Sequence, residues 1–117
     1  MLTFGEKPVY LCCGVTDLRK SINGLMLLVQ NSFALDPYSS AVFAFCNRNR
    51  NRIKILEWDE DGFWLYLKRL DRGRLRWPGL NGDQTMILTD DEFACLIGSA
   101  KLEKKLNWNE LPQRLVV

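Results

Sequence analysis

Any chemistry in this chain of 117 residues would have to come from carboxylates and thiols, because the sequence contains no histidine. Without an imidazole there is no general base for the usual serine or cysteine triads, and the commonest protein ligand for metals is missing. Glu57, Asp59 and Asp61 lie close in the sequence, and a two-metal nuclease requires clustered carboxylates. Acids beside a glycine, however, are more typical of a solvated turn. The residues therefore predict no catalytic site, no metal and no cofactor, with a nuclease that uses these three acids and Asp17 as a minor alternative.

The four cysteines are predicted to be buried free thiols. Cys12 and Cys13 are adjacent rather than spaced as Cys-x-x-Cys, and Cys46 and Cys95 are isolated, so a zinc site would need scattered thiolates alone. No apolar run approaches the roughly 20 residues that a membrane span needs, and no signal peptide precedes Val9. These features predict a soluble cytoplasmic protein in a reducing compartment.

Basic residues are concentrated in the middle of the chain. Nine basic and five acidic residues lie between Arg48 and Arg76, whereas the rest of the chain holds seven basic and nine acidic residues, for a net charge of +2. A positive region favours an anionic partner such as nucleic acid, but a solvated strand surface carries similar charges. Charge alone therefore leaves both interpretations open.

Residues 52–78 have the pattern of a three-stranded antiparallel meander. Runs rich in Ile, Leu, Phe, Trp and Tyr flank two turn signals, one at residues 59–62 and one at residues 71–73. The predicted strands are 53–58, 63–70 and 74–77. In the first hairpin the expected core face pairs Trp58 with Phe63, Leu56 with Leu65 and Lys54 with Leu67, and the other face pairs Glu57 with Trp64, Ile55 with Tyr66 and Ile53 with Lys68.

The second hairpin is predicted to set like charges against each other. With Gly73 in the left-handed conformation, Lys68 lies opposite Arg76 and Leu67 lies opposite Trp77. Such cross-strand repulsion is unfavourable unless an anion or a carboxylate relieves it.

One face of the predicted meander combines aromatic and basic residues: Trp64, Tyr66, Lys68, Arg74 and Arg76. Bases of a nucleic acid can stack on such aromatics while the cations contact phosphates. The same residue types are enriched at protein interfaces, and they can also be covered by a helix of the same chain. All three interpretations of this face stay open.

Further strands are predicted at 9–12, 41–46 and 85–88. Thr16 is a candidate N-cap for a helix at about 17–32, whose apolar stripe comprises Leu18, Ile22, Leu25, Val29 and Phe33. Thr89 and Glu92 form a capping box for a helix at 90–97. The arginine-rich loop 47–52 is either an exposed turn or a contact site.

Together these elements predict one α+β domain over residues 1–117. It has an antiparallel sheet of about five strands, one helix on a face of the sheet and the other near its end. A tail from about residue 101 is expected to be mobile or to dock on a partner.

Several short motifs resemble those of a known family. The chain closely resembles the accessory protein encoded by the second open reading frame of insertion sequence family 66, called TnpB-type and distinct from the RNA-guided nucleases that share this label. The resemblance extends from about Val9 to about Leu106. The loop 47–52 and Glu57 depart from it, because glycine and an aromatic residue, respectively, are frequent there in relatives. The matching residues are Thr16-Asp17-Leu18-Arg19-Lys20, Ile22, Gly24-Leu25, Asp36-Pro37, Phe43, Phe45, Lys54-Ile55-Leu56, Trp58-Asp59, Gly62-Phe63, Lys68-Arg69-Leu70, Gly73-Arg74 and Trp77-Pro78.

The resemblance implies a bacterial accessory factor for transposition that acts beside a separate transposase and has no catalytic activity of its own. We expect it to bind DNA of the element ends. The candidate DNA-binding residues are Arg19, Lys20, Lys68, Arg69, Arg74 and Arg76. The alternative is an adaptor that joins the transposase, other proteins of the element or further copies of itself, with Trp64 and Tyr66 as the partner-binding residues.

Overall fold

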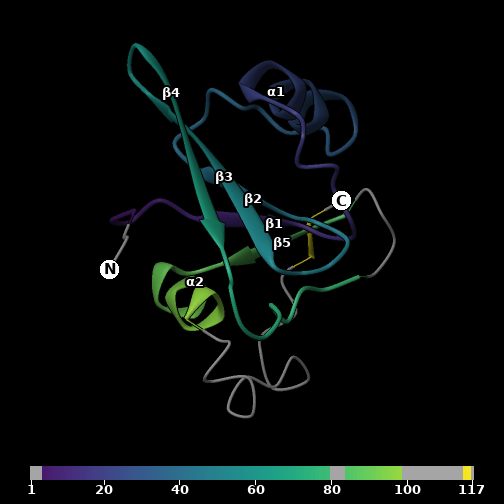
Figure 1. Ribbon diagram of the computed structural model, residues 1–117. Helices are drawn as coiled ribbons and strands as arrows, with labels where there is room; N and C mark the ends of the chain where they lie inside the picture. The colour runs from purple at the N-terminus through teal and green to yellow at the C-terminus, as the bar shows by residue number, and fades with distance from the viewer. Residues whose placement is uncertain (1–3, 80–83, 99–114, 117) are drawn as a thin grey trace.

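The computed structural model describes residues 4–79, 84–98 and 115–116, which form a β-sheet with a helix on either side (Figure 1). The sheet has six strands in the order β4-β3-β2-β1-β5-β6, and β1 and β2 are its one parallel pair in this part of the chain. In chain order the elements are β1 (Val9–Cys12), α1 (Ile22–Asn31), β2 (Val42–Cys46), β3 (Arg52–Asp59), β4 (Gly62–Arg69), β5 (Thr85–Leu88), α2 (Asp90–Ile97) and β6 (Leu115–Val116).

The α+β class is confirmed, but the expectation of a purely antiparallel sheet was wrong at β1 and β2. The connection between them contains α1, and a crossover through a helix returns the chain in its original direction, so the two strands run in parallel. The tail predicted from about residue 101 lies outside the described residues, apart from β6.

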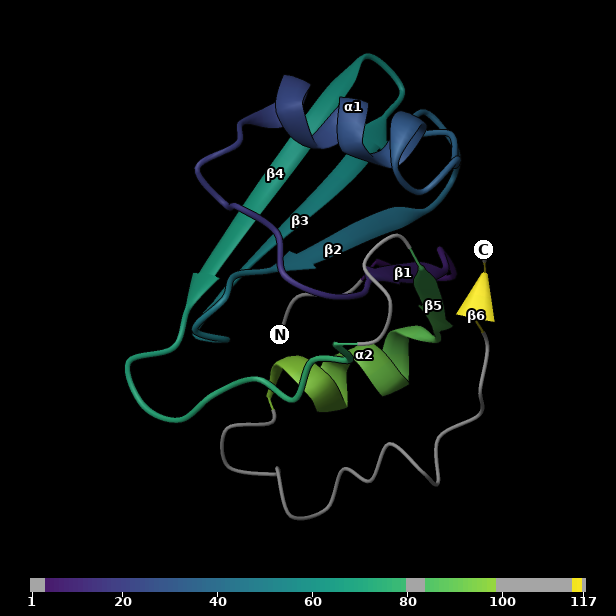
Figure 2. The same cartoon turned by 90° about the vertical axis from the view of Figure 1, so that its right-hand side faces the viewer.

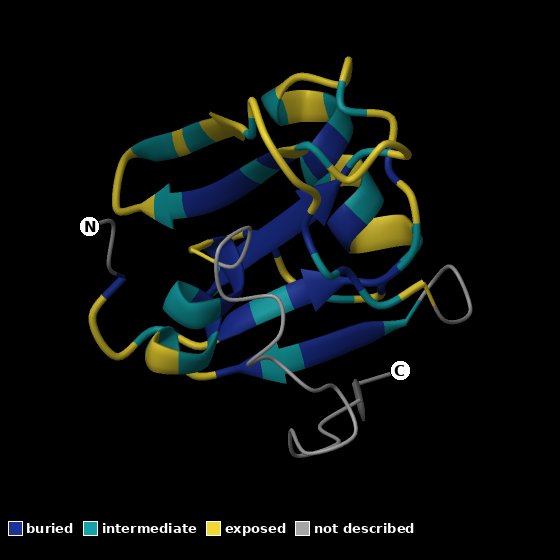
Figure 3. Ribbon diagram, turned by 60° about the horizontal axis from the view of Figure 1, so that its bottom comes forward, coloured by how far each residue is buried: buried dark blue, intermediate teal, exposed yellow. Residues whose placement is uncertain are grey.

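The two helices cover opposite faces of the sheet (Figure 2). Leu25 and Val29 of α1 pack against Phe43, Phe45 and Leu56 on one face, which we call the α1 face. The other face, the α2 face, packs against α2 and the segment 70–79. Because alternate side chains of a strand point to opposite faces, β2 is buried at all its positions, as its continuous apolar run predicts (Figure 3).

The hairpin of β3 and β4 has the predicted register. Leu56 lies opposite Leu65, Ile55 opposite Tyr66 and so on through both strands, with the turn at residues 60–61. The interpretation of the faces was incomplete, however. The expected core face is buried at Leu56, but Ile53 and Ile55 on the other face are equally buried, since α2 covers that side.

The third strand of the meander, predicted at 74–77, was wrong: residues 70–79 contain no strand. The chain leaves the sheet after β4 and crosses the α2 face, where Leu75 and Trp77 are buried. The Leu75 N–H donates to the Arg50 carbonyl at 2.7 Å, and the Trp77 indole N–H donates to the Cys12 carbonyl at 3.0 Å. At the edge of the sheet Trp77 would be covered on one side only, whereas on the face its whole ring is buried. The predicted Lys68–Arg76 and Leu67–Trp77 pairings therefore do not form.

Helix α1 begins later than predicted. Its N-cap is Ser21, whereas Thr16 is buried and its N–H donates to the Cys46 carbonyl at 2.9 Å. Asp17 accepts the Arg19 N–H at 3.0 Å, a local turn that competes with helix formation.

Helix α2 has the predicted bounds and the predicted capping box. The Glu92 N–H donates to the Thr89 hydroxyl at 3.2 Å, and the Thr89 N–H donates to the Glu92 carboxylate at 2.9 Å. Phe93 and Leu96 bury its apolar side against the sheet. In the part of the chain that the structure describes, neither helix has the length and apolar character of a membrane span.

The cysteines are free thiols, as predicted. Cys12 and Cys46 are buried in strands and Cys13 is buried directly after β1, whereas Cys95 on α2 is half-buried rather than buried as predicted. Burial raises the pKa of Cys13 to about 11 and that of Cys46 to about 12, because a thiolate loses its hydration there. These thiols are consequently poor nucleophiles at neutral pH.

Candidate nucleic-acid interface

An open groove of about 760 Å³ lies beside the beginning of β3, on the α1 face. Four cations line it, against one carboxylate, Asp17. We call it the basic groove. Its cations are Arg19, Arg48, Arg52 and Lys54, and its other lining residues are Val15, Thr16, Leu18, Asn47, Asn49 and Leu67.

One wall of the groove is the segment between β1 and α1. The Thr16 bond to β2 anchors this segment on the sheet. The Arg19 guanidinium donates to the Asp17 carboxylate at 2.7 Å, and these hydrogen bonds hold the pKa of Asp17 well below its usual range. The Arg19 side chain is nevertheless 91% exposed, so its charge stays accessible to a ligand in the groove.

The second wall is the loop 47–52, which Asn47 organises. Its side-chain carbonyl accepts the N–H groups of Asn51 and Arg52, each at 3.0 Å, and its amide donates to the Asn51 side chain at 2.7 Å. Arg50 adopts a positive φ of 57°, and its guanidinium lies next to Gly79, away from the groove. The loop therefore separates its three arginines: Arg48 and Arg52 line the groove, and Arg50 does not.

The floor comes from β3 and β4. Lys54 lies opposite Leu67. Arg52 lies opposite Arg69, so these two like charges face each other across the strands. Arg69 donates to the Asp71 carboxylate at 3.0 Å, and this exposed ion pair offsets part of the repulsion. An anion in the groove would relieve the Arg52–Arg69 repulsion.

The six predicted DNA-binding residues lie in two places. Arg19 lines the groove, Arg69 is the cross-strand neighbour of Arg52, and the Lys20 carbonyl accepts the Lys54 ammonium at 3.0 Å.

The other three predicted cations are on the opposite side. Lys68 points to the α2 face, where its ammonium donates to the Ile97 carbonyl at 3.0 Å, at the end of α2. Arg74 and Arg76 belong to the segment 70–79 that crosses this same face. The structure thus does not bring the six residues into one surface.

The set of predicted DNA-binding residues did not include Arg48, Arg52 and Lys54, although the loop 47–52 was considered as a possible contact site. A signal for Lys54 was present in the sequence, because the predicted register places it on the expected core face. A lysine at the end of an apolar face marks the point where the core ends and a polar surface begins. No local pattern connects that point with residues 15–19.

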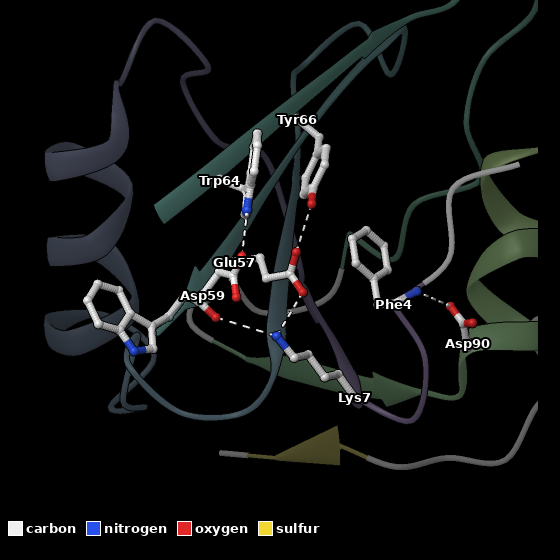
Figure 4. Close-up of polar contacts among 8 residues, drawn as sticks. Phe4, Lys7, Glu57, Asp59, Trp64, Tyr66 and Asp90 are labelled. Carbon is white, nitrogen blue, oxygen red and sulfur yellow. Dashed lines mark hydrogen bonds and ion pairs between the residues drawn. The ribbon is translucent and has the colours of Figure 1, made fainter. Parts of the chain in front are cut away.

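Trp64 and Tyr66 lie on the α2 face, beside a small polar network (Figure 4). The Tyr66 hydroxyl donates to one oxygen of Glu57 at 2.8 Å, and the Lys7 ammonium donates to the other at 2.8 Å. The Tyr66 ring packs edge-on against Phe4, with centroids 5.5 Å apart. Tyr66 is therefore partly covered by its own chain, and its bond to Glu57 holds it there.

Trp64 differs from Tyr66 in its exposure. Its indole N–H donates to Asp59 at 2.9 Å and its ring stacks beside Tyr66, but 55% of the residue is exposed. It remains available to a partner.

Alkaline pH is expected to remove the stabilisation that Tyr66 provides. Burial and the bond to Glu57 raise the pKa of Tyr66 from 10.0 to about 12, so the folded state holds this proton more tightly than the unfolded chain does. The stabilisation is full below pH 10 and is lost as the pH rises to about 12. Urea unfolding of wild type and Tyr66→Phe at increasing pH should show their stability difference shrinking over this window.

The control for this experiment is Tyr38→Phe, because Tyr38 is exposed and its hydroxyl contacts the sulfur of Met26 rather than a carboxylate. A Tyr66→Phe difference that stays constant between pH 7 and pH 12 would contradict the expected linkage.

The carboxylates of the nuclease hypothesis do not converge. Asp17 is paired with Arg19, Glu57 with Lys7, and Asp59 accepts the Trp64 indole. Over residues 4–79 and 84–98, no three His, Cys, Asp or Glu side chains are grouped so that they could hold a metal ion.

Comparison with known proteins gives consistent matches. The model of the IS66 Orf2 like protein family matches residues 7–107. Uncharacterized protein y4hO of Sinorhizobium fredii is 38% identical over 83 residues, which cover 70% of this chain and 72% of that protein. Uncharacterized protein y4jC of the same organism is 28% identical over 100 residues, covering 86% and 80%. No solved structure matches the chain. The family match spans most of the sheet, both helices and the whole basic groove, and the chain belongs to the IS66 Orf2-like proteins.

Proposed function

We propose that this protein is a noncatalytic accessory factor for transposition that binds DNA of its element through the basic groove. Membership of the IS66 Orf2-like family indicates an accessory role in transposition, in association with the transposase of the element. The observation that supports DNA binding is the convergence of four cations from two stretches distant in the sequence, residues 15–19 and 48–54, on one open groove.

The charges of the groove suit a phosphate backbone. Arginine forms paired hydrogen bonds with phosphate oxygens, and three of the four cations are arginines. Arg69, the cross-strand neighbour of Arg52, adds a cation at the border of the groove, and the Lys20 backbone carbonyl holds the Lys54 ammonium in place. Contacts of this kind position a protein on a duplex without reading its sequence, so sequence preference is expected to be modest.

The exposed apolar residues of the groove add a second kind of contact. Val15 is 54% and Leu67 is 61% exposed beside the cations. Apolar side chains at such a position can pack on sugars or on a thymine methyl group.

Binding is tested by fluorescence anisotropy with labelled duplexes of the element ends and of unrelated sequence, at a series of salt concentrations. The affinity should fall steeply with salt, with a logarithmic slope of about −3 to −4 for three to four phosphates neutralised. Arg48→Ala with Arg52→Ala should weaken binding on the order of 50-fold at about 0.1 M salt and reduce the slope by about two.

Arg74→Ala with Arg76→Ala is the matched control, since it removes the same charge from the α2 side. It should weaken binding much less than the groove pair. The groove variant is expected to fold, because removal of Arg52 relieves its repulsion with Arg69. Absent or salt-independent binding would refute DNA binding altogether, and a larger loss in the Arg74 and Arg76 variant would move the DNA surface to the α2 side.

A second candidate function is an adaptor for the transposase, favoured by the exposed ring of Trp64. Co-purification of the two proteins should then survive nuclease treatment and weaken with Trp64→Ala. Loss of the complex on nuclease treatment would show that DNA connects them instead.

A further inference from the structure

The outer edge of β4 carries an unusual distribution of side chains. Within the described residues β4 is the first strand of the sheet and pairs only with β3. It is eight residues long and contains neither proline nor a bulge, two of the devices that protect an edge from pairing, and its charged residues lie only at its end. Its exposed apolar residues are Trp64 on the α2 face and Leu67 on the α1 face.

Charges are separated along this edge. Acidic residues occupy the turn before the strand, at 59–61, and basic residues, Lys68 and Arg69, occupy its end. The residues between them are apolar or aromatic. When such a strand pairs antiparallel with a copy of itself, the acidic end of each copy meets the basic end of the other.

We propose that two copies of this chain pair through their β4 edges, with Leu65 opposite Leu65 of the second copy. In this register Phe63 faces Leu67, Trp64 faces Tyr66 and Asp61 faces Arg69, and each contact occurs twice because the dimer has two-fold symmetry. Every pair joins residues on the same face of the two sheets, as the pleat requires.

Neighbouring registers are less favourable. A shift that sets Tyr66 opposite Tyr66 brings Arg69 opposite Phe63 and leaves Arg69 without an acidic partner from the second copy. A shift in the other direction sets Trp64 opposite Trp64, but it places Asp61 opposite Leu67 and Gly62 opposite Tyr66. Acids also face the cations in the Trp64 register, but only the proposed register both pairs apolar with apolar residues throughout and sets Asp61 opposite Arg69.

The dimer does not depend on DNA binding, and it is expected to be moderate in affinity. A single pair of edge strands buries less area than the roughly 1,600 Å² of a standard interface, so we expect a dissociation constant in the micromolar range.

One consequence does rest on the proposed function. The two-fold axis keeps the α1 faces of both copies on the same side of the joined sheet, so both basic grooves face the same way. The two Arg52 positions are offset by eight residues along the strands and are separated by three strand spacings across them. They therefore lie about 30 Å apart, close to the roughly 34 Å of one DNA turn. Two adjacent turns of one duplex could then bind both grooves.

Sedimentation equilibrium of the nuclease-treated protein from about 1 to 100 µM tests the dimer without DNA. The wild type should associate in this range. Asp61→Arg and Arg69→Asp should each weaken association about tenfold, because each change creates two like-charge contacts. The combination of both substitutions restores opposite charges and should recover association. Both residues are exposed, and urea unfolding checks that each variant is folded.

Trp64→Ala should also weaken association, while Leu27→Ala, which truncates an exposed apolar side chain on α1, should not. A protein that stays monomeric at the highest concentration would overturn the proposal. A dimer that neither single charge reversal weakens would equally overturn it, because its interface would then lie elsewhere. DNA binding by a monomeric protein would leave the proposed function intact.

Discussion

Replacement of Trp77 by alanine is expected to lower the free energy of unfolding by about 3–5 kcal/mol. The ring is 4% exposed and packs in the core of the α2 face. Its indole N–H donates to the Cys12 carbonyl at 3.0 Å, so truncation removes apolar contacts and a buried hydrogen bond together. Urea unfolding followed by circular dichroism measures the loss.

Two further variants separate the contributions of Trp77. Trp77→Phe keeps most of the apolar surface but leaves the Cys12 carbonyl without this donor, at a cost of about 1–3 kcal/mol. Arg74→Ala, on the same segment but exposed, should stay within about 0.5 kcal/mol of wild type. A loss below about 1 kcal/mol for Trp77→Ala would mean that residues 70–79 do not dock on the sheet.

Phe43→Ala should destabilise the opposite face by a similar amount, about 3–5 kcal/mol. Phe43 is 1% exposed and stacks on Tyr10, with ring centroids 5.5 Å apart and an interplanar angle of 20°. It also belongs to the cluster that contains Leu25 of α1, so its loss leaves a cavity between helix and sheet.

The matched control for Phe43 is Leu27→Ala, since Leu27 lies on α1 but is 51% exposed. That substitution should change stability by less than about 0.5 kcal/mol. Equal effects of the two substitutions, measured by urea unfolding, would contradict the packing of α1 on this face. Large losses at both Trp77 and Phe43 would show that the sheet needs cover on both faces.

Short-range signals were sufficient for the hairpin of β3 and β4 and for α2. A turn at residues 60–61 and a two-residue side-chain period determine which residues of β3 and β4 face each other, so the register followed without knowledge of the fold. The capping box of Thr89 and Glu92 likewise lies within four residues. The start of α1 failed because the Asp17 turn and the buried bond of Thr16 to Cys46 outweigh the capping preference of Thr16.

The third strand of the predicted meander, and with it the predicted basic face, failed for a different reason. Alternation of Leu75 and Trp77 indicates that both are buried, but a strand edge and the face of a sheet are equally compatible with that pattern. Only the packing of α2 and of residues 70–79 on one face decided between them, and it removed the predicted cross-strand pairing of Lys68 with Arg76.

The amino-acid sequence was therefore enough for the family, the α+β class, the β3–β4 register and the concentration of charge between Arg48 and Arg76. The tertiary structure alone decided which cations share a surface. The basic groove joins residues 15–19, the loop 47–52 and β4, and these segments meet because β1 and β2 are parallel neighbours with β3 beside them. Local patterns report the face of a strand or helix, whereas contacts between distant segments depend on strand order, which no short motif in this chain specifies.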